Sequence, residues 1–244
     1  VESQLKDSVA ASHLALQVKE ALGGLSEASP AVAASFKYST YGAGAMKVVL
    51  VPGATVFNET HNDRALAYFE VRKNQMTVAG GLRVNLNKAV KVQVGTGEYI
   101  VGTDFHTVFA HELGHGVSGK IAVLASQKGV MVGKALYESK PSTYWAKGVS
   151  RYAAKNYREL MAESFAAYTH PRYSEGKALP KEITAVFEAA GVKPGTRRYS
   201  TSSDAPLRQL SQPFLFPDSV LAYADAAGRV YAYDPGQLRD PAGT

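Results

Sequence analysis

The chain has 244 residues, of which 45% are hydrophobic and 20% charged, and these values are ordinary for a globular protein with a sizeable core. It contains no cysteine, which excludes disulfides, cysteine-ligated zinc and thiol nucleophiles and slightly favours a secreted, extracellular or virion-associated protein. No apolar run reaches the length of a membrane span. The start at Val1 lacks a basic-then-apolar leader, so we expect a processed end.

The formal net charge of +6 is concentrated in one stretch of the chain. Between Gly116 and Arg158 a single acid, Glu138, stands among many basic residues, which are Lys120, Lys128, Lys134, Lys140, Lys147, Arg151, Lys155 and Arg158. Such a stretch could face an acidic substrate, a polyanion or a negative membrane surface. A solvated surface is the more common explanation of a charge run, and we expect no nucleic-acid partner.

The first third of the chain predicts two helices and three strands. Apolar residues recur at helical spacing over residues 3–22 and stop at Gly23-Gly24, and "SPAVAASFKYS" predicts a short helix from Pro30. The β-branched run "MKVVLVPG" predicts a buried strand. "LAYFEVRKN" and "QMTVAGGLRVNLN" predict two more strands, with Lys73-Asn74 in the turn between them and a bulge or close backbone approach at Gly80-Gly81.

The remainder of the chain predicts mainly helices. One begins at about Thr103 as N-cap, with Asp104 in its first turn, and ends at Gly119; others cover residues 120–137, 143–153, 155–169 and 180–190. "VLAYADAAGRVYAYD" alternates like a β-hairpin, and "PGQLRDPAGT" predicts a loose tail. Helices, strands and helices in this order favour an α+β domain over residues 1–195 with a C-terminal extension over residues 196–244.

The segment "HELGH" at residues 111–115 carries the strongest chemical signal. On a helix, His111 and His115 lie one turn apart on the same face, so both imidazoles can reach one metal ion. Glu112 is offset around the helix, where it can touch a metal-bound water without binding the metal. Gly114 and Gly116 each weaken a helix by roughly 1 kcal/mol, which suggests that another part of the backbone packs closely there.

A catalytic zinc takes three protein ligands and keeps a fourth position open. A third histidine six residues after His115 is excluded, because that position is Ile121. Glu159 and Glu163 lie one helical turn apart among apolar residues, where a carboxylate is costly unless it is paired or binds a metal. Tyr152, nearly two turns before Glu159, would bring its phenol to the same face if the segment were helical.

These motifs together resemble a known family. HELGH followed by S-x-Y-x-x-x-N-x-x-E-x-x-x-E-x-F resembles the gluzincin-type zinc metallopeptidases represented by the anthrax lethal factor catalytic domain and the Pro-Pro endopeptidases. The matching positions in the second motif are Ser150, Tyr152, Asn156, Glu159, Glu163 and Phe165. The resemblance covers roughly residues 100 to 170.

The resemblance implies a zincin-like fold with a small mixed sheet, an active-site helix carrying HExxH and a helical C-terminal subdomain. It implies one Zn²⁺ per chain, held by His111, His115 and Glu159. Glu112 would be the general base and Tyr152 the catalytic phenol, and Glu163 would be the partner of a ligand histidine. The expected function is a zinc-dependent endopeptidase acting on a protein or peptide bound in extended conformation, with "QMTVAGGLRVNLN" as the candidate edge strand for that substrate.

Other interpretations remain open. The chain could be a virion or secreted interaction protein that retains a metallopeptidase-like zinc domain, although a purely structural zinc site needs no base and closes its fourth position. It could also be a metal-dependent amide hydrolase acting on cell wall, which would suit the basic stretch. Tyr144 and Tyr157 are the substitutes for Tyr152. We expect His106 to be a first-turn surface residue, and three other histidines to be structural: His13, His61 and His170.

Overall fold

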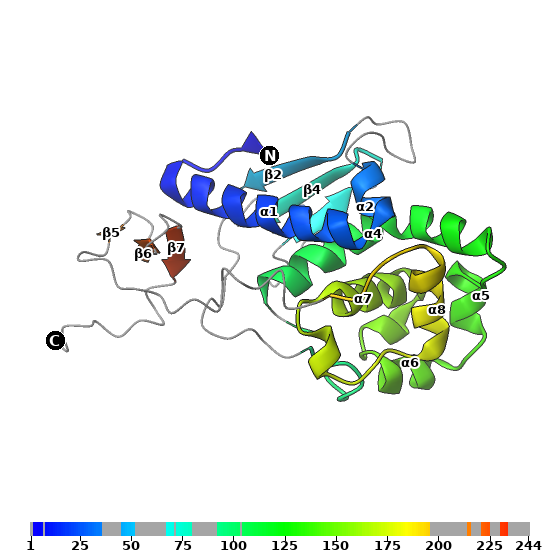
Figure 1. Ribbon diagram of the computed structural model, residues 1–244. Helices are drawn as coiled ribbons and strands as arrows, with labels where there is room; N and C mark the ends of the chain where they lie inside the picture. The colour runs from blue at the N-terminus through cyan, green and yellow to red at the C-terminus, as the bar shows by residue number, and fades with distance from the viewer. Residues whose placement is uncertain are drawn as a thin grey trace.

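The computed structural model describes residues 2–6, 8–35, 45–51, 67–70, 72–79, 92–102 and 104–195, together with three short strands at 214–215, 221–224 and 230–233. Within these residues the chain has the predicted α+β fold (Figure 1). None of the described helices is both long and apolar enough to cross a bilayer.

A four-stranded mixed sheet, in the order β1-β2-β4-β3, forms one layer of the molecule. β1 (Glu2–Ser3) and β4 (Gln75–Ala79) both run parallel to β2 (Lys47–Val51), and β3 (Ala67–Glu70) runs antiparallel to β4. β2 is buried along most of its length, as its run of β-branched residues predicts. The turn between β3 and β4 falls at Lys73-Asn74 as expected, and Asn74 adopts a left-handed φ of 48° there.

The position of β4 corrects one prediction. β4 lies between β2 and β3, so residues 75–79 are not an edge strand; among the described strands, β3 forms the edge on that side. The order of the strands in the sequence is misleading here, because β3 precedes β4 along the chain but lies beyond it in the sheet. Gly80-Gly81, where a bulge was predicted, lie outside the described residues.

The first helices lie along the sheet (Figure 1). α1 (Ser8–Ala28) is followed by α2 (Pro30–Ser35), which begins at Pro30 as predicted. The predicted end of the first helix at Gly23-Gly24 is wrong. Leu22 and Leu25 are buried on either side of the pair, and their packing outweighs the modest helix penalty of two glycines.

The helix that carries HELGH is longer than predicted. α4 (Phe105–Ser126) has Asp104 as its N-cap, whose side chain accepts a hydrogen bond of 3.1 Å from the backbone N–H of Thr107. Thr103, the predicted N-cap, lies outside the described residues. The helix does not stop at Gly119, because Val117 and Ile121 continue its buried face across that glycine. It stops only before Gly129, which turns the chain with a φ of 76°.

Short helices make up the rest of the domain. They are α5 (Gly133–Glu138), α6 (Ser142–Gly148), the 3₁₀ helix η1 (Ala153–Lys155), α7 (Tyr157–Thr169), η2 (Tyr173–Glu175) and α8 (Lys181–Ala189). The predicted helix over residues 120–137 is therefore split between the end of α4 and α5. The predicted helix over 143–153 ends early at Gly148, whereas α7 and α8 agree closely with prediction.

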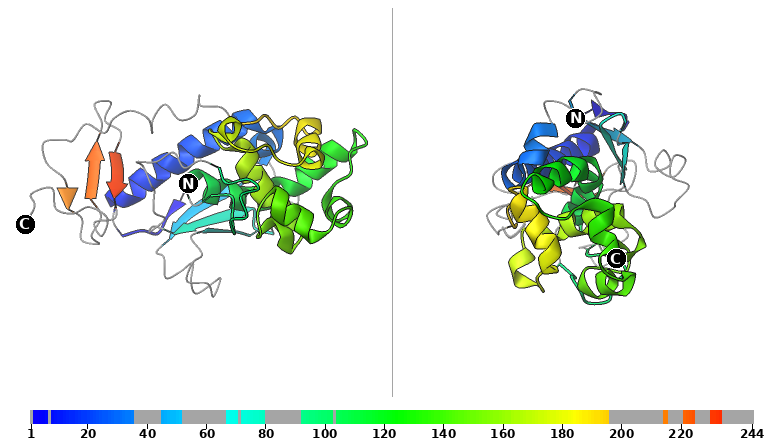
Figure 2. Two further views of the ribbon diagram at one scale, coloured as in Figure 1. Left: turned by 90° about the horizontal axis from the view of Figure 1, so that it is seen from below. Right: turned by 90° about the vertical axis from the view of Figure 1, so that its right-hand side faces the viewer.

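α4 lies between the sheet with α1 on one side and the helices α5 to α8 on the other (Figures 1 and 2). Fully buried side chains on α4, α7 and α8, such as Phe109, Phe165 and Phe187, join the two halves into one core. Near the C-terminus, β5 (Phe214–Leu215), β6 (Leu221–Ala224) and β7 (Val230–Tyr233) form a separate antiparallel sheet. β6 and β7 form the predicted hairpin; the predicted loose tail lies outside the described residues.

Candidate metal centre

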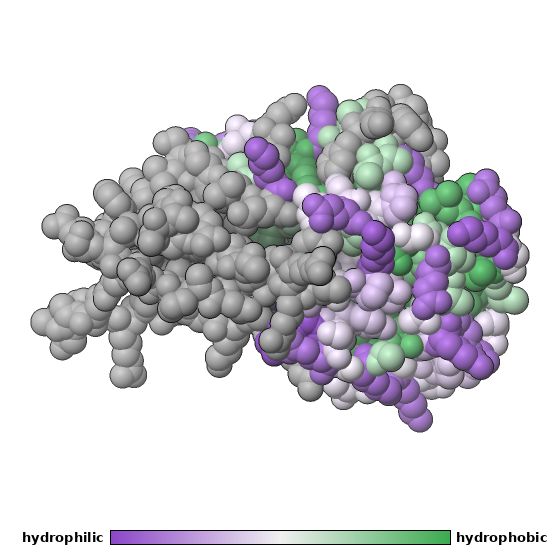
Figure 3. Space-filling view, in the orientation of Figure 1, coloured by the Kyte–Doolittle hydropathy of each residue, from purple (hydrophilic) through white to green (hydrophobic). Residues whose placement is uncertain are grey.

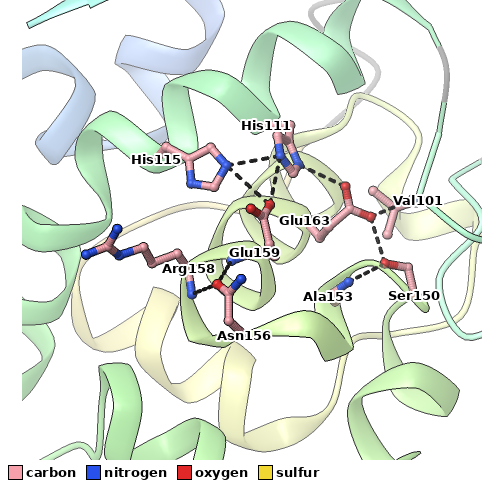
Figure 4. Close-up of polar contacts among 9 residues, drawn as sticks. All are labelled: Val101, His111, His115, Ser150, Ala153, Asn156, Arg158, Glu159 and Glu163. Atoms are coloured by element: carbon pink, nitrogen blue, oxygen red, sulfur yellow. Dashed lines mark hydrogen bonds and ion pairs between the residues drawn. The ribbon is translucent and has the colours of Figure 1, made fainter. Parts of the chain in front are cut away.

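Three side chains from two helices converge on one point. His111 and His115 project from α4, one turn apart, and Glu159 projects toward them from the first turn of α7 (Figure 4). The two Nε2 atoms lie 3.1 Å apart, and each lies 3.3 Å from Oε2 of Glu159. Within the described part of the chain, this is the group of histidine and acidic side chains that could hold a metal ion.

The spacing of the three atoms fits a small divalent ion. Ligand atoms about 2.0–2.2 Å from a tetrahedral metal lie roughly 3.3 Å from one another. The contacts to Oε2 of Glu159 are not directed as hydrogen bonds, so this buried oxygen has no hydrogen-bond partner among the described residues. A buried carboxylate oxygen without a partner is costly. A cation bound by all three atoms would remove that cost.

Glu163 fixes the orientation of the His111 ring. Nδ1–H of His111 donates to Oε1 of Glu163 over 2.8 Å, so the Nε2 side of the ring faces Glu159. The other oxygen, Oε2, accepts from the backbone N–H of Val101 at 2.9 Å and from the hydroxyl of Ser150 at 2.7 Å (Figure 4). Both carboxylate oxygens are thus occupied, which holds the imidazole in one tautomer and one rotation.

Asn156 sets the direction of Glu159. The residue is extended, with φ −167° and ψ 171°, and its side chain caps α7 by accepting from the N–H groups of Arg158 and Glu159, at 2.9 and 3.1 Å. The capped turn points Glu159 at the histidines. Ser150 and Asn156 are part of the sequence motif, but their contacts were not predicted. Val101 contributes only its backbone, so no side-chain pattern could have indicated it.

Charge coupling within the group is strong. Burial alone lowers the pKa of His111, but the carboxylates of Glu159 and Glu163 outweigh it and raise that pKa to about 10. Burial raises the pKa of Glu159, whereas its contacts with the two histidines lower it to about 2. A cation bound by the same atoms would compete with the proton that His111 shares with the two carboxylates.

Glu112 lies beside the three ligands without joining them. The pKa of its carboxyl is raised by burial, against the opposing effect of His111 and His115; Glu159 raises it further, and a hydrogen bond from the Phe69 backbone lowers it. A carboxylate with a raised pKa, close to but outside a metal-binding group, accepts a proton more readily than an ordinary carboxylate does.

The ring of Tyr152 lies next to the ring of His111, with 5.8 Å between their centroids. Burial raises the pKa of the phenol to about 12, with further contributions from Glu159 and Glu112, so the phenol keeps its proton at neutral pH. The segment is not a continuous helix. Tyr152 precedes η1, and the extended backbone of Asn156 separates η1 from α7.

The two substitute tyrosines make other contacts. Tyr144 donates to Glu182 over 3.0 Å, and the hydroxyl of Tyr157 accepts from Nε of Arg158 over 3.2 Å. Of the three tyrosines considered, Tyr152 is the one whose ring the structure places against a member of the metal-binding group.

The two glycines inside HELGHG allow the close approach that the sequence suggested. A Cβ atom on Gly114 would lie 3.0 Å from Cα of Ala162 on α7, so the backbones of the two ligand-bearing helices nearly touch. A Cβ on Gly116 would collide with the ring of Phe69 on β3. The prediction that another backbone packs closely is therefore confirmed at Gly114, whereas at Gly116 the close neighbour is a side chain.

A second histidine pair lies at the start of α4, away from the metal-binding group. Nε2 of His170 lies 3.4 Å from Oδ1 of Asp104, and the rings of His106 and His170 meet edge to face with centroids 5.4 Å apart. Nε2 of His106 is buried without a partner among the described residues, so the expectation that His106 is a surface residue is wrong. The cause is the end of α7, which folds over the first turn of α4. His13 and His61 have no described side-chain environment.

The basic stretch is partly neutralised on the surface. Lys134 pairs with Glu138 and Lys140 with Glu182, each over 3.5 Å. Hydrophilic residues are spread over the face formed by the short helices rather than gathered in one block (Figure 3).

No family model, no curated protein and no solved structure matches the chain.

Proposed function

We propose that the protein is a zinc-dependent endopeptidase of the gluzincin type, with a zincin-like fold and one Zn²⁺ per chain. The observation that carries the proposal is the triangle of His111, His115 and Glu159 donor atoms, with sides of 3.1 to 3.3 Å and a proton-accepting carboxylate beside it. Two imidazoles and one carboxylate are a common ligand set of catalytic zinc, and a purely structural site would need no such neighbour.

Zinc, when bound, would polarise the peptide carbonyl and lower the pKa of a water molecule toward neutrality. Glu112 would take the proton of the attacking water and pass it to the leaving amine. Its raised pKa suits the first half of that transfer, because a carboxylate of ordinary acidity takes up a proton less readily.

Tyr152 would donate its phenolic hydrogen to the carbonyl oxygen as negative charge develops there. The position of its ring beside His111 and its raised pKa support this role, because the hydroxyl remains a donor at neutral pH. Glu163 would not touch the substrate; it would keep the His111 ring aligned.

An extended substrate would lie along β3 rather than along the segment predicted from the sequence. β3 is the edge strand next to β4 among the described strands, and its Phe69 contacts both Gly116 and Glu112 of α4. A peptide that adds a strand to this edge would pass close to the metal-binding group.

The test is hydrolysis of an unstructured peptide pool by the zinc-loaded protein. We expect Glu112→Gln to lower kcat/KM by about 10²–10⁴-fold while zinc content stays near one per chain. Tyr152→Phe should lower kcat by about 10²-fold, also with zinc retained. Glu159→Ala should lose the metal as well as the activity. Glu138→Gln, a surface carboxylate paired with Lys134, is the matched control and should change neither.

Two results would contradict the proposal in different ways. Undiminished cleavage by Glu112→Gln would remove Glu112 as the base. Zinc binding without cleavage of any peptide would instead favour a binding protein or a hydrolase of another amide.

A further inference from the structure

Two tyrosines and two cations form a cluster beside the metal-binding group that the mechanism above does not use in full. The ammonium of Lys155 lies 4.5 Å from the ring centroid of Tyr152 and 5.4 Å from that of Tyr99. The guanidinium of Arg151 lies 5.8 Å from the Tyr99 ring, and the two rings are 5.4 Å apart. These four residues are called the cationic subsite below.

Backbone hydrogen bonds hold the cationic subsite together. The N–H of Arg151 donates to the carbonyl of Glu98 over 3.1 Å, and the N–H of Tyr152 donates to the carbonyl of Tyr99 over 2.8 Å. The loop that carries Tyr99 is therefore fixed against the segment that leads into α7. A rigidly held subsite loses little entropy on binding a ligand group.

Among the residues that the structure describes, no acid neutralises the charges of the cationic subsite. No carboxylate of the described residues lies within ion-pair distance of Arg151 or Lys155, whereas Lys134 and Lys140 of the same basic stretch each have one. Both cations are exposed, and they contact ring faces, which leave their N–H donors available. Tyr99 is 46% exposed, so part of its ring is open to a ligand.

The cationic subsite is within reach of a peptide bound at the metal. The ammonium of Lys155 lies 4.5 Å from the ring centroid of Tyr152, and the ring centroid of His111 lies 5.8 Å from it. An extended peptide advances about 3.3–3.6 Å per residue. A side chain two or three residues from the cleaved bond can therefore lie over Tyr99 between the two cations.

We infer that Tyr99, Arg151 and Lys155 bind an acidic side chain, aspartate or glutamate, of the peptide substrate within three residues of the cleaved bond. This inference rests on the proposed endopeptidase function. Arg151 supplies a planar donor pair that matches a carboxylate, Lys155 supplies a second charge, and the Tyr99 ring covers the aliphatic part of the side chain. Tyr99, Arg151 and Lys155 select one residue of the substrate and take no part in bond breaking.

The test compares matched peptides that carry glutamate or glutamine at each position within three residues of the cleaved bond. At one position the zinc-loaded protein should prefer glutamate by about 10-fold or more in kcat/KM, and Arg151→Gln or Lys155→Gln should each reduce that preference by about 3–10-fold. Both variants should lose more activity toward the glutamate peptide than toward the glutamine peptide, so the ratio of the two kcat/KM values is the readout. Lys128→Gln, an exposed lysine beyond the far end of α4, removes the same charge and should leave the preference intact.

A binding measurement separates this inference from the proposed function. Fluorescence anisotropy of the same labelled peptides should show tighter binding of the glutamate form, and this difference should disappear in the Arg151→Gln, Lys155→Gln double variant whether or not the peptide is cleaved. Cleavage or binding without a glutamate preference would overturn the subsite alone. Tight binding of polyglutamate without any positional preference would also overturn it, in favour of a polyanion surface. Binding with the preference but without cleavage would overturn only the endopeptidase proposal.

Discussion

Glu163 connects α7 to three other parts of the chain through one carboxylate that is 2% exposed. It accepts hydrogen bonds from His111 on α4, from the backbone of Val101 in the preceding loop, and from Ser150 before η1. Since these donors differ in type, the consequences of removing the carboxylate and of removing one donor can be measured separately.

We expect Glu163→Gln to weaken zinc binding by about 10–100-fold, because the amide group must turn its N–H₂ toward at least one donor and so loosens the His111 ring. Ser150→Ala removes only one of the three hydrogen bonds and should have a smaller effect. Competition with a chromophoric chelator measures both affinities. Equal zinc affinity in Glu163→Gln and wild type would show that the His111 ring is held by packing alone.

His106 makes stability depend on pH. Burial lowers its pKa from 6.5 to about 4; His170 lowers it further, while Asp104 and the backbone of Thr169 partly offset the effect. Between these two pH values the unfolded chain takes up a proton that the folded chain rejects. The contribution of the neutral His106 ring to the free energy of unfolding is therefore complete above pH 6.5 and is lost as the pH falls toward 4. The total loss is on the order of 3 kcal/mol.

Urea unfolding over this pH range measures the effect. His106→Gln carries no titrating ring, so its free energy of unfolding should fall less steeply with acidity than that of the wild type. Other groups also titrate in this window, and the difference between the two proteins isolates the contribution of His106. Parallel pH dependences would mean that the imidazole is already accessible to protons in the folded state.

At the scale of elements, the contact between α4 and α7 depends on Gly114. Its missing Cβ lets the helix backbone lie against Ala162, and a methyl group there would force the two ligand-bearing helices apart by a few tenths of an ångström. We expect Gly114→Ala to destabilise the protein by about 1–3 kcal/mol and to weaken metal binding as well, because Glu159 moves with α7.

Gly119 on the same helix is the matched control. Nothing lies within 4 Å of the position its Cβ would take, so Gly119→Ala should stabilise the helix by about 0.5–1 kcal/mol. If the contact with α7 makes Gly114→Ala destabilising, chemical denaturation should show changes of opposite sign in the free energy of unfolding of the two variants. Two variants of equal stability would show that α4 and α7 can adjust to a methyl group.

The elements differ in how far the sequence predicts them. α7 and α8 are close to prediction, since both have regular apolar spacing and α7 also has a capping side chain in Asn156. Gly23-Gly24 and Gly119 mislead because a glycine inside a helix costs only about 1 kcal/mol, which neighbouring buried side chains such as Leu25 and Ile121 outweigh. Strand order is not encoded in local pattern, so the central position of β4 was not predictable.

The part of the candidate site that depends on local helical spacing could be predicted from the sequence. His111 and His115 lie at a spacing that a helix converts directly into a shared face. Glu159 and Tyr152 required the longer motif as well, and their convergence on the histidines depends on the break at Asn156. The hydrogen bond from Val101 and the pairing of His106 with His170 arise from folding of distant segments, and no spacing in the sequence indicates them.

In the whole molecule, α4 lies between the sheet and the later helices (Figure 2). Two of the donor atoms belong to α4 and the third to α7, so a bound metal would link the halves of the core. A ligand that binds the folded chain alone stabilises it in proportion to the logarithm of its concentration relative to Kd. Metal affinity is therefore measurable as stability of the entire domain.

We expect zinc in thousandfold excess over Kd to stabilise the wild-type protein by about 4 kcal/mol, which corresponds to a rise in Tm of roughly 10 °C relative to protein treated with chelator. Glu112→Gln should show the same rise, because Glu112 lies outside the donor triangle, whereas Glu159→Ala should show little of it. The rise should shrink in acid, since protons compete with the metal for the His111 ring. A Tm that chelator leaves unchanged, in protein shown to contain zinc beforehand, would place the metal somewhere other than between α4 and α7.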